Sequence, residues 1–361
     1  MALFALNLLI CSGQRDSLTY RLSGLQAQYG FIIPHSDYIE PVSHTNPVGV
    51  SFDLMRVRKT FESWSVFNSF WFHGLQFSYF NFQNPDVLGS AFVLTPFAEP
   101  VVFNRNRFLL TLRTGLGISW VTEIYEEETN PTNMFFCTHI AFSPYMAVRM
   151  RYRVSPEWFI TLSGFYNHIS NGGMKQPNYG MNFPTVALGA EYIRDPFTLE
   201  RKAYTIDDRD KYKVWYYRLQ AFGGLKVAGE TEEYPEVVAL VSAFNFEAFR
   251  RLGMHYAIGF GAEYVNDREL KEEIEREGLD VDNKRVAITA SQDFHFGRII
   301  LSQHFGIYVY SPYEAVDPVY QMYGLGVRVS RRIMTGVFLK AHRHMADFMG
   351  LSLSYIGGKI E

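Results

Sequence analysis

Alternation between apolar and polar side chains is the feature that most limits what this chain can fold into. It is clearest over residues 139–154, where one parity is mainly apolar and the other includes Arg149, Arg151 and Arg153. A period of two residues is that of a β-strand, whose successive side chains point to opposite faces. Similar segments recur from about residue 18 to 356, which predicts an all-β protein. Three arginines on one strand face predict a watery lumen or a solvated surface behind that face.

The connections between these segments indicate how the strands are joined. Short turns, such as those at 104–106 and 155–157, alternate with longer connections, such as those at 122–135 and 170–182. Outer-membrane barrels have short periplasmic turns and longer external loops. The pattern therefore predicts an antiparallel up-and-down transmembrane β-barrel of roughly 14 to 16 strands. The connection near 196–209 is an exception, because it is long on the side of the short turns.

Composition narrows the class of protein. The chain has 361 residues, of which 47% are hydrophobic and 16% aromatic, and its formal net charge is -3. It has no basic excess of the kind that nucleic-acid binding requires, so no nucleic-acid partner is expected. No apolar run reaches the length of about 18 residues that a transmembrane helix needs.

The first residues are expected to be a secretion signal peptide. Residues 1–10 are apolar, and the small residues Ser12 and Gly13 that follow suit signal-peptidase cleavage, which leaves 14–361 as the barrel. A buried first strand and a misassigned start codon are alternatives, and so is a lipid-anchored Cys11, which the bulky Leu9 and Ile10 before it disfavour. After removal of 1–13, Cys137 is the one remaining cysteine, so no internal disulfide is expected.

Reactive side chains gather at the end of one alternating segment. His168 and Ser170 are two residues apart, so in a strand they point to the same face, and a histidine beside a hydroxyl is the minimum unit of an activated nucleophile. The preceding positions of the same parity, from Trp158 to Tyr166, are mainly apolar. In a membrane barrel this parity faces lipid, so the pair would lie at the membrane rim.

The neighbouring residues could complete an esterase site. The backbone amides around Asn171, Gly172 and Gly173 follow the serine directly, where a glycine-rich bend can direct N–H groups at a developing oxyanion. Asn182 begins the next strand on the apolar parity, and a hairpin would return it beside His168. The alternative is that these residues are ordinary turn chemistry in an external loop.

The same segment resembles the PagL-like lipid A 3-O-deacylases, which are outer-membrane barrel esterases. The matching positions are His168, Ser170, Asn171, Gly173, Pro177, Asn178 and Gly180. A looser resemblance covers residues 64–192, and the motifs at 84–89, 94–97 and 128–131 look like the larger Bacteroidetes-type members called acyloxyacyl hydrolases. The resemblance implies hydrolysis of the ester-linked acyl chain at position 3 of lipid A. Ser170 would be the nucleophile, His168 the general base, and Asn171 and Asn178 oxyanion supports.

Two departures from the family pattern affect these expectations. The best-known members have a glutamate where this chain has Asn182; an asparagine oxygen can hold the imidazole tautomer but adds no negative charge. Those members are also about half as long, with eight strands. The PagL-like region is expected at about 64–195, and further strands at about 211–361 would form either a wider barrel or a second β half beside an eight-stranded one.

The hypothesis from sequence is therefore an outer-membrane serine esterase acting on lipid A or a related glycolipid in the outer leaflet. It needs no cofactor and no metal, and its partners would be lipopolysaccharide and membrane lipids. Two rivals stay open: a barrel that has lost the chemistry and acts as a porin-like or structural protein, and a soluble lipid-binding barrel.

Overall fold

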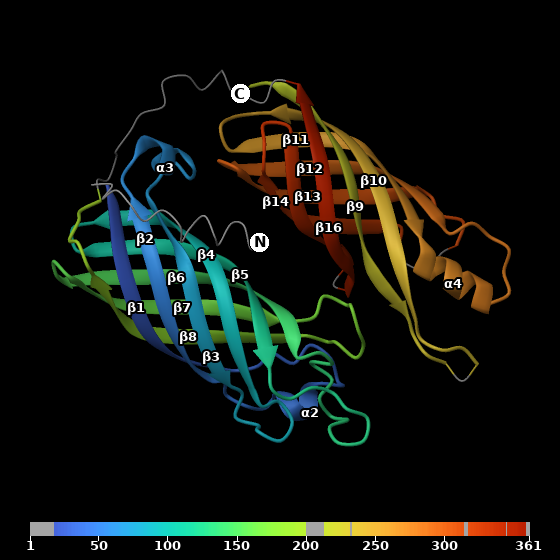
Figure 1. The fold of residues 1–361 in the computed structure, drawn as a ribbon, viewed down its shortest axis with the longest axis horizontal. Helices are drawn as coiled ribbons and strands as arrows, with labels where there is room; N and C mark the ends of the chain where they lie inside the picture. Colours follow the sequence, from blue (N-terminus) through green and yellow to red (C-terminus); the bar gives the residue numbers. More distant parts are fainter. Residues whose placement is uncertain (1–17, 200–212, 232, 314–316, 344, 359–361) are drawn as a thin grey trace. The chain divides into compact units, whose positions relative to one another are not determined.

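The computed structural model describes most of the chain and shows two closed antiparallel β-barrels of eight strands each (Figure 1). The described residues are 18–199, 213–231, 233–313, 317–343 and 345–358. The expected signal peptide at 1–13 lies outside them. The all-β class and the antiparallel order of strands are confirmed, and the sixteen described strands take the two-part form, an eight-stranded barrel and a second β half.

The first barrel is closed by the pairing of its first and last strands, in which Leu22 lies opposite Ile193. Its strands are β1 (Thr19–Gly30), β2 (Val48–Arg58), β3 (Trp71–Asn81), β4 (Ser90–Arg105), β5 (Phe108–Val121), β6 (Ile140–Ser155), β7 (Trp158–Ile169) and β8 (Met181–Ile193). Two short helices, α2 (Glu40–Ser43) and α3 (Phe61–Ser65), lie in the connections after β1 and β2.

The second barrel is closed in the same way by β16 and β9, in which Gly350 lies opposite Gly224. Its strands are β9 (Trp215–Ala228), β10 (Val237–Arg251), β11 (Tyr256–Asp267), β12 (Lys284–Phe296), β13 (Ile299–Tyr310), β14 (Val319–Arg328), β15 (Ile333–His342) and β16 (Met345–Gly358). Helix α4 (Arg268–Arg276) lies between β11 and β12. The long connection after β8 joins the two barrels, which explains the exception in the turn pattern.

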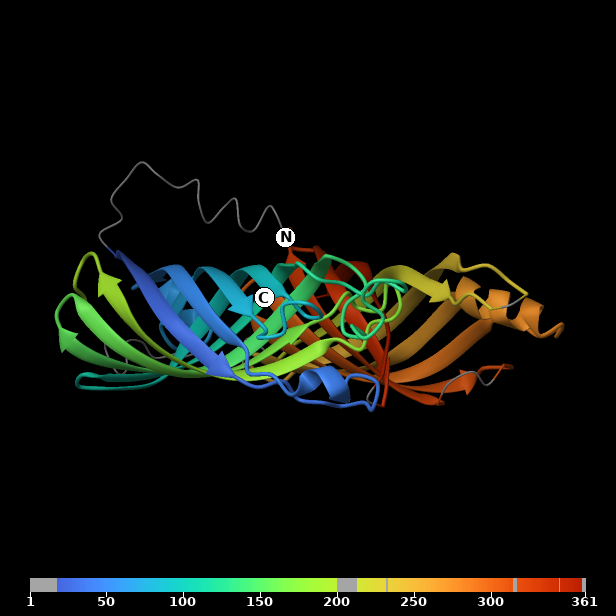
Figure 2. The ribbon, with the colours of Figure 1, turned by 90° about the horizontal axis from the view of Figure 1, so that it is seen from below.

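Within each barrel the strands run obliquely side by side (Figure 2). Burial alternates along them as the sequence pattern predicts. In β7 the inward Phe159 and Thr161 are buried, whereas the outward Ile160 and Leu162 are exposed. Among the described residues no helix is long and apolar enough to cross a membrane.

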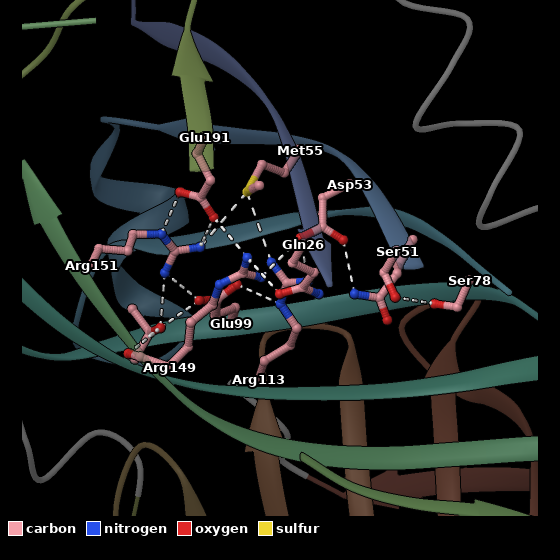
Figure 3. Close-up of polar contacts among 12 residues, drawn as sticks. Gln26, Ser51, Asp53, Met55, Ser78, Glu99, Arg113, Arg149, Arg151 and Glu191 are labelled. Carbon is pink, nitrogen blue, oxygen red and sulfur yellow. Dashed lines mark hydrogen bonds and ion pairs between the residues drawn. The ribbon is translucent and has the colours of Figure 1, made fainter. Parts of the chain in front are cut away.

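An ion-pair network fills the middle of the first barrel (Figure 3). It joins three carboxylates and three arginines, Asp53, Glu99, Glu191, Arg113, Arg149 and Arg151, and all six side chains are at most 1% exposed. The Arg113 guanidinium lies 2.8 Å from Asp53 and 2.7 Å from Glu99, and Arg151 Nε lies 2.7 Å from Glu191. Equal numbers of each charge make the network neutral.

This network corrects the expectation of a watery lumen behind the arginine face. Arg149 and Arg151 do point inward, but carboxylates of β2, β4 and β8 form ion pairs with them there. These ion pairs, rather than bulk water, stabilise the arginine charges. Arg153, at the strand end, lies over the Phe159 ring and donates to the Pro156 carbonyl.

The second barrel is filled on the same principle. Arg218 bridges Glu247 and Asp293 at 2.8 and 3.0 Å, and Lys340 pairs with Glu263 at 2.6 Å. These side chains are at most 1% exposed, so the interior of this barrel also holds paired charges.

Candidate active site

The β7–β8 hairpin brings His168 and Asn182 together, as the sequence predicted. The two residues are directly opposite in the register, and Asn182 Oδ1 lies 2.7 Å from His168 Nδ1. An amide oxygen can only accept, so Nδ1 carries the proton and Nε2 is left as the basic nitrogen. The Ile33 amide donates to the Asn182 carbonyl at 2.9 Å, which fixes the backbone of Asn182 at the end of the β1–β8 ladder.

Ser170 lies just beyond the end of β7 and is held by two bonds to β6. Its amide donates to the Phe142 carbonyl at 3.0 Å, and its carbonyl accepts from the Phe142 amide at 2.8 Å. The side-chain amide of Asn178 donates to Ser170 Oγ at 2.9 Å. In that bond Oγ is the acceptor, so the bond does not use the serine proton.

Gly180 marks the point where the histidine and serine side chains converge. A Cβ atom on Gly180 would lie 3.0 Å from His168 Cε1 and 3.1 Å from Ser170 Cβ. Its φ of +68° is also in the left-handed region that favours glycine. The site therefore needs a glycine here for two independent reasons, backbone conformation and space.

Substituting Gly180 with alanine is expected to reduce any activity of this site about 100-fold, because the added methyl group displaces the imidazole or the serine by a few tenths of an ångström or more. Gly278→Ala is the matched control: Gly278 has a φ of +69°, but nothing lies within 4 Å of its Cβ position. Turnover of an ester substrate by both purified variants checks this. Equal rates for the two variants would show that the contact at Gly180 does not matter.

The remaining predicted residues form the turn that follows Ser170. The Asn171 amide donates to Asn178 Oδ1 at 3.1 Å, so one asparagine side chain contacts both the turn backbone and the serine hydroxyl. The Asn171 side chain is only 1% exposed and donates to Cys137 Sγ at 3.2 Å. Gly172 and Gly173 have φ angles of +73° and +82°, which allow the chain to reverse shortly after Ser170.

Three contributors to the site were not predicted from sequence. Buried Cys137 anchors Asn171, and the carbonyl of Phe135 accepts from the Gly180 amide at 3.2 Å. His35, after β1, has its Nε2 3.0 Å from the Tyr179 carbonyl oxygen. Their distance along the chain from His168 left no local signal by which to find them.

The arrangement can perform nucleophilic catalysis. A hydroxyl with a side-chain amide donor and an imidazole of fixed tautomer lie on either side of Gly180, half-buried at the end of an outward apolar run. These are the components of an acyl-transfer site, namely nucleophile, base, orienting group and oxyanion donor. In the part of the chain that the structure describes, no group of three or more His, Cys, Asp or Glu side chains is arranged to hold a metal ion.

A second serine–histidine–carboxylate set lies inside the second barrel. Ser291 Oγ and Glu247 Oε1 lie 2.9 and 3.0 Å from His304 Nδ1. Both partners meet the same ring nitrogen, whereas a catalytic arrangement needs the acid on one nitrogen and the nucleophile on the other. Glu247 and His304 are also 1% exposed, so this set belongs to the polar interior.

Comparison with known families agrees with the division into two barrels. Residues 48–191 match the family model for lipid A 3-O-deacylase (PagL), and residues 215–357 match the C-terminal domain of acyloxyacyl hydrolase. The first match lies within the barrel that contains His168 and Ser170. No curated protein matches the chain.

Two solved structures of other proteins show a distant likeness to this chain. A triple mutant of the Rhodopseudomonas blastica porin is 6% identical with a TM-score of 0.18, and the match covers 94% of this chain and all of the porin. A mutant of the monoaromatic hydrocarbon channel TodX is 6% identical with a TM-score of 0.19, over 94% of this chain and 89% of the channel.

Proposed function

Because this chain belongs to the PagL-like family of lipid A 3-O-deacylases and carries the C-terminal domain of the acyloxyacyl hydrolases, we propose that it is an outer-membrane serine esterase that removes an ester-linked acyl chain from lipid A. The observation that carries the proposal is the convergence of His168, Asn182, Ser170 and Asn178 in the barrel that matches the deacylase model.

In the proposed reaction Ser170 Oγ attacks the carbonyl carbon of the acyl ester while His168 Nε2 takes the serine proton. The resulting imidazolium still donates its Nδ1 proton in the hydrogen bond to Asn182 Oδ1, and it transfers the Nε2 proton to the departing sugar oxygen. Water, deprotonated by the same imidazole, then attacks the acyl-serine and releases the fatty acid. Serine and histidine return to their starting states.

The Asn178 amide is the best-placed side-chain donor for the oxyanion. It already lies 2.9 Å from Ser170 Oγ, and its own orientation is held by the Asn171 backbone amide. We propose that the backbone N–H groups of Gly172 and Gly173 also stabilise the oxyanion, because these residues follow Ser170 in the chain. A donor held in place before the reaction stabilises the transition state without a reorganisation cost.

Membrane location is supported by the outer surface of the first barrel. Outward residues of β7 from Trp158 to Tyr166 are mainly large and apolar, over about 26 Å along the strand. At the usual tilt this corresponds to roughly 20 Å across a membrane, comparable with the apolar band of about 25 Å on outer-membrane barrels. His168 follows directly, so the site would lie at the rim of the outer leaflet, where lipid A resides. Export would use residues 1–13 as the signal peptide.

Mass spectrometry of lipid A from a Gram-negative host tests the activity. Cells that express the chain should contain lipid A lacking one hydroxyacyl group, whereas cells with an empty vector should not. The protein should also stay with the membranes in high salt and dissolve only in detergent. Unmodified lipid A despite folded protein in the membrane would contradict the deacylase, and release by salt alone would favour a soluble lipid-binding barrel.

The rival function is a porin-like barrel without catalysis. The observation that favours it is the replacement of the family's glutamate by Asn182. The buried ion pairs inside both barrels argue against it, because they occupy the space that a conducting pore would need. Planar-bilayer recordings separate the two: we expect no large, stable current steps from the purified protein. Such steps without esterase activity would favour the porin.

Asn182→Asp is expected to raise kcat/KM about tenfold. The substitution keeps the size of the side chain, so the 2.7 Å contact with His168 Nδ1 can persist, and it adds a negative charge that stabilises the imidazolium. A hydrogen bond to a charged partner is worth about 1–1.5 kcal/mol more than one to a neutral partner. Asn182→Ala, which removes the acceptor, should lower the rate. An unchanged rate in both variants would show that this residue does not orient the base.

A further inference from the structure

Two exposed tyrosines lie beside the candidate active site, on loops rather than on the barrel wall. Tyr38 comes from the connection between β1 and β2 and is 67% exposed, and Tyr179 comes from the β7–β8 loop and is 36% exposed. Their ring centroids are 5.6 Å apart, with an angle of 33° between the ring planes. The high exposure of Tyr38 leaves much of its ring open to a ligand. We call these two residues the tyrosine pair.

The backbone of Tyr179 is joined directly to the geometry of the site. Tyr179 precedes Gly180 in the chain. The Cβ position of Gly180 is 3.0 Å from His168 Cε1 and 3.1 Å from Ser170 Cβ. The Tyr179 amide donates to the Met134 carbonyl at 3.1 Å, which holds this residue in place. Tyr179 is therefore one residue away from the point where the base and the nucleophile approach each other.

The segment before Tyr38 runs alongside the start of β8. The Ile33 amide donates to the Asn182 carbonyl at 2.9 Å. Two residues later, His35 Nε2 lies 3.0 Å from the Tyr179 carbonyl oxygen. Helix α2, which begins shortly after Tyr38, lies among the loops at this end of the first barrel (Figure 1). The two tyrosines therefore reach the site from two different connections.

The tyrosine pair lies beyond the aromatic residues of the wall. On the strands, the exposed outward aromatic residues near this end include Trp120, Tyr29 and Tyr166. Aromatic rings in such positions are typical of the boundary between the apolar core of a membrane and its headgroups. Tyr38 and Tyr179 belong to loops outside the strand ends, so they lie on the water side of that boundary.

Exposed aromatic rings in this position suit the sugar of a glycolipid. The C–H groups on one face of a pyranose ring carry small positive charges, and an aromatic ring presents its negative face to them. Tyrosine adds a hydroxyl that can donate to or accept from sugar hydroxyls. In the proposed reaction the acyl chains of the substrate lie in the membrane. Its sugar therefore lies on the loop side of Ser170, which is the side of the tyrosine pair.

We propose that the tyrosine pair is a sugar-binding subsite, on which the pyranose ring that carries the scissile ester packs so that the ester is directed at Ser170. The inference rests on the proposed function, because it supplies the sugar specificity of that same site. The protein then selects esters of a sugar alcohol over esters of a simple alcohol with the same acyl chain. Tyr38 and Tyr179 are positioning residues, since they contact the part of the substrate that does not react.

The test uses the full chain in detergent micelles with two substrates, lipid A and a p-nitrophenyl ester of the same hydroxy fatty acid, which has no sugar. Tyr38→Ala should raise KM for lipid A about fivefold, and Tyr38→Ala with Tyr179→Ala about tenfold or more. Tyr38→Phe keeps the ring and should stay within about twofold of the wild-type KM. Tyr38→Ala should cleave the p-nitrophenyl ester at the wild-type rate, because this substrate has no pyranose ring to place on the tyrosine pair.

Tyr152→Ala is the matched control, since Tyr152 is an exposed tyrosine on the wall at the opposite end of β6. It should change KM for neither substrate, and a rise for lipid A equal to that of Tyr38→Ala would overturn the proposal. Equal losses of Tyr38→Ala on both substrates would also overturn it, as would an unchanged KM for lipid A in the double variant.

Lipid A binding in a Ser170→Ala background separates the subsite from the deacylase, because this variant is expected to bind lipid A without cleaving it. Native mass spectrometry from micelles should show binding weakened about fivefold when Tyr38→Ala is added. Wild-type protein that binds lipid A through the tyrosine pair but cleaves neither substrate would support the sugar subsite and contradict the deacylase. Cleavage of both substrates with no effect of the tyrosine substitutions would leave the deacylase standing and overturn the subsite.

Discussion

Ser170→Ala should abolish lipid A deacylation, lowering kcat at least about 10³-fold, because the substitution removes the atom that forms the acyl intermediate. His168→Ala should cost a similar factor, since the serine then lacks a base within the site. The two losses should not add in the double variant, because both residues act in one step. Release of the hydroxy fatty acid from lipid A by the purified proteins measures all three.

Ser163→Ala is the matched control, since Ser163 lies on the same strand but is buried on the inward face. Its rate should equal that of the wild-type protein, and the far-UV circular dichroism of all variants should show the same β content. Full activity in Ser170→Ala would mean that this hydroxyl is not the nucleophile. The hydrogen bond from Asn178 would then have only a structural role.

Breaking the interior network should have the largest effect on stability. Arg151 forms ion pairs with Glu191 and Glu99, and all three side chains are fully buried. Arg151→Met would therefore leave a net negative charge inside the barrel. Removal of one partner from a buried ion pair costs about 3–5 kcal/mol. We expect the free energy of unfolding, measured by urea titration in micelles with tryptophan fluorescence, to fall by about this amount.

A compensating variant distinguishes lost charge balance from lost packing. Arg151→Met with Glu191→Gln restores neutrality and should recover most of the loss. Arg107→Met, in an exposed turn, should change the free energy of unfolding by no more than about 0.5 kcal/mol. If Arg151→Met were as stable as the wild-type protein, the interior carboxylates would have to be hydrated or protonated.

The sequence predicted the β7–β8 hairpin of the candidate site better than the turn that follows Ser170. His168 and Asn182 lie on adjacent strands joined by one loop. Their shared outward parity and the hairpin connection were therefore enough to predict the contact between their side chains. The roles of Asn178 and Gly180 depend on how the loop folds back over Ser170. That path is held by bonds to Phe135 and Cys137, which come from a different connection.

The surroundings of the arginine-bearing face of β6 could not be predicted from that strand alone. Alternation placed Arg149 and Arg151 on the polar side of β6, and the structure agrees. Whether that side is wet depends on Asp53, Glu99 and Glu191, which come from three other strands. No pattern within β6 could indicate that pairing, and the expected watery lumen was wrong for that reason.

Sequence alone determined the strands, their up-and-down order and the outward parity of His168 and Ser170, because a period of two is a local property of the backbone. Only the tertiary structure decided that the sixteen described strands close as two barrels. Closure depends on which distant edges pair, β1 with β8 and β9 with β16, and such pairings leave no trace in the local period. The same holds for the neutral interior, which arises from the register between separate strands.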